Sequence, residues 1–258
     1  MIADTLLALF VAHLLADFSL QPEWMLRHKK NPAILVLHTL IVAGIAALTL
    51  GAAPWRLIAM LAGTHLLMDM IKVYGLGNSL RSFLADQLVH LGVIAGLGAL
   101  YPGAFSNGLW ANLPSGWLAN YQGALCLVAG LVLSLHVGAI IIRKATKPFL
   151  GQIRGDIAGL EGGGAYIGYL ERALVMLLVL INQPAGVGFL VAAKSILRFG
   201  DVKETHQRKM TEYVIIGTFL SFGWGLLIAT LAQMALKHWM PDLFLAIPAL
   251  PATAPGAV

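Results

Sequence analysis

Histidine and aspartate recur at a fixed spacing in the first half of the sequence. His13 and Asp17 are four residues apart in the run HLLAD, and His65 and Asp69 repeat that spacing in HLLMD, 52 residues later. Residues four apart lie on one face of a helix, so the two members of each pair project together. Imidazole and carboxylate are ligands that zinc, manganese and iron accept. Both pairs are therefore candidate metal ligands.

Two further histidines extend this pattern into a duplication. His38 follows His13 by 25 residues, and His90 follows His65 by the same interval. The apolar runs after these second histidines, IVAGIA and VIAGLG, also correspond. Such agreement over several positions predicts two copies of a two-helix unit.

The duplication predicts a four-helix His/Asp bundle over residues 1–101, with copies at about 2–51 and 56–101. Because each copy contains two spans, the copies share one orientation and are related by a pseudo-two-fold axis along the membrane normal. The polar residues of all four helices then fall in one layer near the cytoplasmic side. The predicted metal ligands are His13, Asp17, His38, His65, Asp69 and His90.

The two copies differ at two positions. Asp86 stands where the first copy has Ile34, and Lys72 stands where it has Leu20. We expect Asp86 to bridge ions or act as a base, and Lys72 to hold substrate charge, which makes them the candidate catalytic residues. The simpler interpretation is that Asp86 suits the start of a helix, where the dipole favours acids, and that Lys72 snorkels.

Aspartates inside a membrane require compensation, because a charged side chain at mid-helix costs about 2.5–3.5 kcal/mol on insertion scales. One or two divalent ions, zinc, manganese or iron, would supply it, and two-metal sites serve phosphoester hydrolysis. The same residue types could instead hydrogen-bond neighbouring helices or form a proton or ion relay.

Membrane-spanning helices must position these residues. The chain has 258 residues, 59% hydrophobic and 11% charged, whereas soluble domains have about 25% charged residues. Its apolar runs are long enough to cross a hydrocarbon core of about 30 Å. The predicted fold class is all-α, a polytopic transmembrane helical bundle of about eight spans, the seventh a short span or a re-entrant segment. The spans are expected at about 2–20, 33–51, 56–74, 83–101, 120–142, 164–182, 185–199 and 212–236.

Basic residues orient this bundle. Fourteen of the 17 Lys and Arg fall on one side of the alternating topology, which the positive-inside rule makes cytoplasmic. Both termini are then predicted to face outward from a bacterial cytoplasmic membrane. The net charge of +5 is explained by this placement and indicates no nucleic-acid partner. Cys126 is the single cysteine, so no disulfide can form within one chain.

The second half is predicted to contain an outward interfacial loop, a helical bundle and a disordered Pro/Ala-rich tail, at 102–119, 120–236 and 237–258. Arg172, Lys194 and Arg198 are candidate substrate-binding residues, since their charges suit a phosphate or an anionic lipid head group. Structural ion pairs and orientation signals would equally explain them.

Several runs resemble a known family: HLLADFSLQPEWM, THLLMDMIK and FLADQLVH, followed by IGYLERALVMLLVL, AAKSILRFGD and EYVIIGTFLSF. They are similar to a bacterial integral-membrane family catalogued as domain of unknown function 3307, and the resemblance extends over nearly the whole chain. It implies a multi-pass membrane protein and transfers no activity. The HLLxD pattern also resembles membrane proteins labelled metal-dependent hydrolases.

The leading hypothesis is an intramembrane metal-dependent hydrolase of lipid-linked phosphoesters. No Ser or Cys nucleophile with an obvious partner stands out, so an activated water is the expected nucleophile. Membrane lipids and a lipid-linked or small anionic substrate are the expected partners. Whether the protein is an enzyme stays open, and the alternatives are a proton- or ion-coupled transporter and a non-catalytic membrane scaffold or sensor.

Overall fold

The computed structural model describes residues 1–153, 160, 162–196, 205–241 and 243, and their regular structure is entirely helical. Seven helices are long and apolar enough to cross a membrane. The predicted all-α polytopic bundle is therefore confirmed, with α9 as a shorter apolar helix. The helices are α1 (Ile2–Leu14), α2 (Glu23–Arg27), α3 (Pro32–Leu50), α4 (Trp55–Gly75), α5 (Leu80–Leu100), α6 (Ser115–Val132), α7 (Gly138–Leu150), α8 (Gly163–Leu180), α9 (Ala185–Ile196) and α10 (Thr205–Trp239), with π-helices η1 (Leu15–Ser19) and η3 (Leu133–Val137) and the 3-10 turn η2 (Trp110–Asn112).

Local sequence signals fix where α3 and α5 begin. The Asn31 side chain accepts a hydrogen bond from the Ala33 amide, and Pro32 occupies the first position of α3. The Ser79 hydroxyl caps α5 in the same way. Side-chain caps and a first-turn proline satisfy or remove the unpaired amides of a helix start. These two starts set the depth of His38 and His90 in the bundle.

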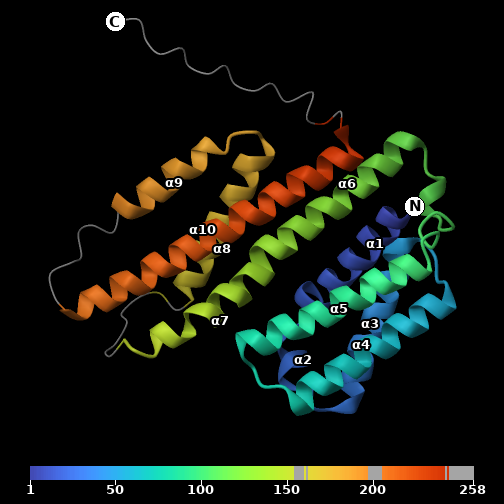
Figure 1. Cartoon of the computed structure of the whole chain (residues 1–258), viewed down its shortest axis with the longest axis horizontal. Helices are drawn as coiled ribbons and strands as arrows, with labels where there is room; N and C mark the ends of the chain where they lie inside the picture. Colours follow the sequence, from blue (N-terminus) through green and yellow to red (C-terminus); the bar gives the residue numbers. More distant parts are fainter. Residues whose placement is uncertain (154–159, 161, 197–204, 242, 244–258) are drawn as a thin grey trace, which may run out of the picture.

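Helices α1, α3, α4 and α5 pack in a ring. Helix α1 contacts α3 and α5, and α4 contacts the same two neighbours; Figure 1 shows the four side by side. An apolar cluster fills the end of the ring at which α1 begins. It includes Leu9, Val42, Leu57 and Leu97. The His and Asp side chains fall on the other side of this apolar cluster. A two-helix duplication requires such a ring, and the duplication itself stays a prediction.

The second half forms a bundle that contains the two longest continuous helices of the described chain. Helices α6, η3 and α7 run continuously over Ser115–Leu150, 36 residues or about 54 Å, which exceeds the predicted span at 120–142. The extension follows from Arg143, Lys144, Ala145 and Lys147 after the apolar run, which favour helix and continue it past the hydrocarbon core, although Pro148 lies in the last turn. Helix α10 likewise includes 237–239, which were assigned to the tail; residues 244–258 lie outside the described part.

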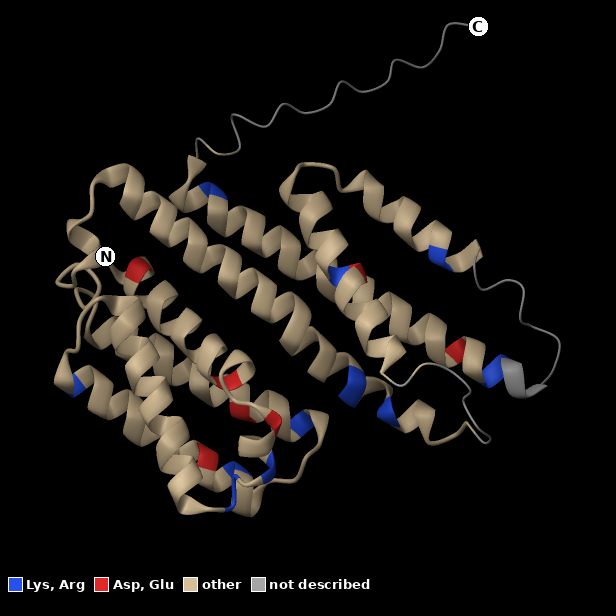
Figure 2. Cartoon of the chain, turned by 180° about the vertical axis from the view of Figure 1, so that it is seen from behind, with Lys and Arg blue, Asp and Glu red and all other residues tan. Residues whose placement is uncertain are grey.

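The two ends of the described chain meet at one end of the bundle. Asp4 Oδ1 accepts hydrogen bonds from Gln122 Nε2 at 2.8 Å and Trp239 Nε1 at 3.0 Å. This joins the start of α1 to the start of α6 and the end of α10. Most Lys and Arg gather toward the opposite end of the helices (Figure 2).

Helix α9 follows α8 and precedes α10 in the chain, and it runs opposite to both. Arg172 of α8 meets Ser221 of α10, and farther along both helices Val179 meets Gln233, so α8 and α10 run in the same direction. Helix α9 runs antiparallel to α8, because Lys194 near its end pairs with Glu171. The described part of the predicted segment 185–199 thus returns along α8.

Candidate metal centre

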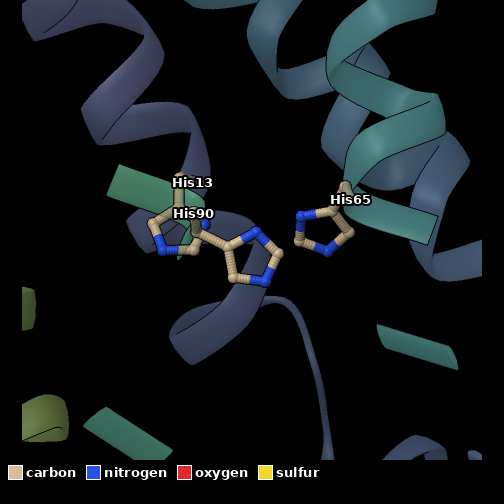
Figure 3. A group of neighbouring side chains, drawn as sticks. All are labelled: His13, His65 and His90. Atoms are coloured by element: carbon tan, nitrogen blue, oxygen red, sulfur yellow. The ribbon is translucent and has the colours of Figure 1, made fainter. Parts of the chain in front are cut away.

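The structure brings the six predicted ligands and Asp86 together in one cluster inside the ring of α1, η1, α3, α4 and α5. Three of the histidines, His13, His65 and His90, converge there (Figure 3). Every member is buried apart from Asp17, whose side chain is 8% exposed. Three overlapping groups of ligand atoms in the described residues could hold a metal ion: His13, His65 and His90; Asp17, His38 and His65; Asp69, Asp86 and His90.

Three of these ligand atoms have the spacing of a single metal site. His38 Nε2 lies 3.2 Å from Asp17 Oδ1 and 3.1 Å from His65 Nε2, and His65 Nε2 lies 3.5 Å from Asp17 Oδ1. Metal bonds of about 2.0–2.1 Å in a tetrahedron separate neighbouring ligand atoms by roughly 3.3–3.4 Å. These three atoms can therefore form one face of a tetrahedral site.

Hydrogen bonding alone does not satisfy this arrangement. His38 Nε2 carries at most one proton, yet it faces Asp17 Oδ1, His65 Nε2 and, at 3.7 Å, Asp69 Oδ2. His38 Nδ1 has no hydrogen-bond partner in the described structure, so it does not fix the ring as the second nitrogen of a metal-bound imidazole commonly does. Several lone pairs converge on one point, where a cation would be stabilised.

A second set of unpaired atoms lies beside the first. Asp69 Oδ2, Asp86 Oδ1 and His90 Nε2 are buried and have no hydrogen-bond partner in the described part of the chain. Asp86 Oδ1 and His90 Nε2 are 3.4 Å apart, and Asp69 Oδ2 is 3.7 Å from His65 Nε2. Buried polar atoms in native proteins nearly always have a partner, so these exceptions require an explanation.

His13 occupies a different position from its predicted counterpart His65. Its Nε2 is 3.1 Å from Gln87 Oε1, and its Nδ1 is 3.8 Å from Asp17 Oδ2, the oxygen that does not face His38. His13 therefore lies behind Asp17 and helps to orient it. A cavity of about 10 Å³ adjoins His13, His65 and His90, about the size that one water requires.

A π-helix explains part of this asymmetry. Asp17 lies in η1, where the Leu20 amide bonds to the Leu15 carbonyl five residues back, whereas Asp69 lies in the regular helix α4. The sequence predicted equivalent helical pairs. The wider turn of a π-helix changes the direction of a side chain, and such turns are frequent at functional sites. Asp17 is thereby directed at both His38 and His65.

Two lysines neutralise carboxylates of the cluster. Lys29 Nζ donates to Asp69 Oδ1 at 2.8 Å, and Lys72 Nζ pairs with Asp86 Oδ2, which also accepts from Gln87 Nε2 at 3.0 Å. The sequence singled out Lys72 but not Lys29 or Gln87. Two sequence features could have indicated them. Lys29 lies in the basic connection after the first span, and Gln87 directly follows Asp86. With side chains 11% and 30% exposed, Lys29 and Lys72 connect the cluster to the surface.

Arg172 lies apart from this cluster, on α8, and its guanidinium is used structurally. Nε donates to the Ser134 carbonyl at 2.7 Å, Nη2 to the Leu135 carbonyl at 3.1 Å and Nη1 to Ser221 Oγ at 3.1 Å. Both carbonyls belong to η3, whose π-turn leaves carbonyl groups to be satisfied from outside the helix. Arg172 therefore joins η3 to α8 and α10.

The other two predicted substrate-binding residues also belong to the second half. Lys194 pairs with Glu171 Oε1 at 2.6 Å, whereas the His/Asp cluster lies on α1, η1, α3, α4 and α5. Arg198 lies outside the described residues. The structure thus separates Arg172 and Lys194 from the predicted ligands.

The fold and the site together define a multi-pass helical membrane protein with a buried His/Asp cluster. A family model described as "Protein of unknown function (DUF3307)" matches residues 5–110, so this part of the chain is similar to that family. The matched range contains the whole cluster and ends before the motifs of the second half. No curated protein and no solved structure matches the chain.

Proposed function

We propose that the cluster is a divalent-metal centre in which Asp17, His38 and His65 hold the ion. The observation that carries this proposal is the convergence of Asp17 Oδ1, His38 Nε2 and His65 Nε2 within 3.1–3.5 Å of one another. Two imidazoles and one carboxylate leave one tetrahedral position for water or substrate, as catalytic zinc sites do. Asp69 Oδ2 lies 3.7 Å from both His38 Nε2 and His65 Nε2.

The charges of the cluster favour one ion over two. Asp17, Asp69 and Asp86 contribute three negative charges, and Lys29 and Lys72 contribute two positive charges. With neutral imidazoles the cluster carries one negative charge, so one divalent ion leaves a single positive charge and two ions leave three. Uncompensated charge in a membrane interior is costly. A single ion with one anionic group of a substrate best balances the site.

This charge and the open position support hydrolysis of a phosphoester carried by a lipid. The ion would supply Lewis acidity and activate water, which are its general contributions in such enzymes. Lys29 and Lys72, at the surface side of the cluster, would hold phosphate oxygens. Either Asp69 or Asp86 would accept the proton of the attacking water, because each has a buried carboxylate oxygen that makes no hydrogen bond among the described residues.

Phosphate release from membrane substrates tests this function. The purified protein, reconstituted with zinc or manganese, is assayed with phosphatidic acid and with a polyprenyl diphosphate. We expect release that chelator abolishes and that His38→Ala lowers by at least about a hundredfold. His28→Ala serves as the control, because His28 is exposed and outside the cluster. Activity that survives both chelator and His38→Ala, or metal-loaded protein inert toward both substrates, contradicts the hydrolase.

A second candidate function is supported by the row of imidazoles. The ring centroids of His13 and His90 are 5.0 Å apart, those of His90 and His65 4.5 Å, and those of His65 and His38 5.0 Å. Adjacent imidazoles of this kind form proton relays in transporters. A proton-coupled carrier requires uptake driven by a pH gradient in proteoliposomes, and His90→Phe should abolish it. Metal-dependent phosphate release without such uptake would exclude this second candidate.

A further inference from the structure

A second polar site lies in the other half of the molecule. A cleft of about 510 Å³ opens between α7, α8 and α10, and Lys194 of α9 reaches its wall. Small-molecule sites commonly have volumes of about 300–1,000 Å³. No residue of α1, η1, α3, α4 or α5 lines this cleft. It is therefore separate from the proposed metal centre and does not depend on it.

One side of the cleft carries basic side chains that make no hydrogen bond or ion pair with other described residues. Arg143 and Lys147, one turn apart on α7, both line it and are exposed. In the described structure neither makes a hydrogen bond or ion pair, whereas Arg172 is occupied by η3 and Lys194 by Glu171. Residues four apart share one helix face. The two side chains can therefore contact the same anion.

An unpaired acceptor lies on the opposite wall. Glu171 Oε1 accepts from Lys194, but Glu171 Oε2 is buried without a hydrogen-bond partner among the described residues. A buried carboxylate oxygen requires a donor. The remaining lining includes Ile140, Ile167 and Val214, which suit hydrocarbon.

We propose that this cleft binds one phospholipid whose head group carries both a phosphate and a hydrogen-bond donor. Arg143 and Lys147 contact the phosphate, Glu171 accepts the hydroxyl or ammonium hydrogen, and an acyl chain lies against the apolar wall. Arg143 and Lys147 lie on α7. Most Lys and Arg gather toward one end of the bundle (Figure 2), and basic side chains at such a level meet lipid head groups. A hydroxylated anionic lipid such as phosphatidylglycerol supplies a phosphate for Arg143 and Lys147, a hydroxyl donor for Glu171 and acyl chains for the apolar lining. Phosphatidylcholine has no hydrogen-bond donor in its head group.

Lipid competition measured by native mass spectrometry of the full chain tests the proposal. We expect phosphatidylglycerol to bind about tenfold or more tightly than phosphatidylcholine, and Arg143→Ala/Lys147→Ala to remove most of that preference. Arg143→Lys/Lys147→Arg should retain it, because the charges remain. Lys30→Ala is the matched control, since Lys30 is an exposed basic residue outside the cleft. Glu171→Gln should lower the preference for the hydroxylated head group severalfold.

Three results would overturn the proposal. Equal binding of the two lipids would mean that the cleft selects only hydrocarbon. Unchanged phosphatidylglycerol binding in the double alanine variant would exclude Arg143 and Lys147 as its phosphate contacts. Glycerol phosphate that competes as strongly as the intact lipid would identify a site for soluble phosphates.

Discussion

His13 and His65 occupy equivalent positions in the sequence but have different surroundings. His65 Nε2 faces His38 and two carboxylates, whereas His13 bonds to Gln87 and lies behind Asp17. We therefore propose that His65 binds the ion and that His13 orients a ligand. This distinction depends on atoms that face the cluster and makes the two histidines experimentally separable.

Zinc titration should show that the two histidines contribute differently to zinc affinity. We expect His65→Ala to abolish tight binding, and His13→Ala to weaken it by about 10–100-fold, the usual effect of losing a group that orients a ligand. Calorimetry on the metal-free protein measures both constants, with His28→Ala as the control. Equal losses in the His13 and His65 variants would contradict the assignment.

Removing one member of the Lys29–Asp69 pair should destabilise the protein before any ion binds. Lys29→Met leaves Asp69 buried without its ammonium partner, and breaking such a pair costs about 3–5 kcal/mol. Lys29→Met/Asp69→Leu should recover most of that loss, because no uncompensated charge remains. Denaturation of chelator-treated protein in detergent measures the difference. If the double variant were as unstable as Lys29→Met, the pair would not explain the loss.

At the level of elements, the two π-helices set the geometry that an ordinary helix would not provide. Helix η1 turns Asp17 toward the cluster, and η3 presents carbonyls that Trp224 and Arg172 satisfy. The i,i+4 pairs and the layer of polar residues were readable from spacing. The π-turns were not, because a single wider turn leaves no periodic signature in an apolar run. Lys29 was missed because its contact crosses from a connection to α4.

Packing at η3 gives a test of this element. A Cβ on Gly138 would lie 2.6 Å from Trp224 Cδ1 and 3.1 Å from Arg172 Nε, so Gly138→Ala must displace the indole or the guanidinium. Overpacking of this kind costs about 1–3 kcal/mol. Gly223→Ala is the matched control, because a Cβ there meets nothing within 4 Å. Equal unfolding free energies for the two variants would contradict the tight contact at η3.

The whole molecule combines a four-helix ring, which contains the His/Asp cluster, with a second helical bundle. That second bundle contains the cleft for which we propose a phospholipid. Composition and apolar run length were sufficient to predict the all-α membrane fold, because the bilayer limits the length and polarity of each span. These two features did not predict the length of the continuous helix over Ser115–Leu150, because the helix continues past the apolar run. The separation of Lys194 from the His/Asp cluster could not be predicted from the sequence, because it depends on how the helices of the two halves pack.

Orientation follows from the same architecture. In a Cys126→Ala background, Asn107→Cys and Gly77→Cys place exposed thiols at opposite ends of α5. By the positive-inside rule we expect a membrane-impermeant maleimide to label residue 107 in intact cells, and residue 77 only after lysis. The reverse pattern would invert the proposed orientation, and labelling of both in intact cells would exclude a span between them.

Metal content tests the central claim most directly. The protein, purified without chelator and reconstituted with zinc or manganese, is analysed by elemental mass spectrometry beside His38→Ala, Asp17→Asn and His28→Ala. We expect about one ion per chain in the wild type and in His28→Ala, and almost none in the other two variants. A wild-type protein that retains no ion would show that the cluster is not a metal centre. An Asp17→Asn/His38→Ala double variant that retains the wild-type amount would show that these two residues do not hold the ion.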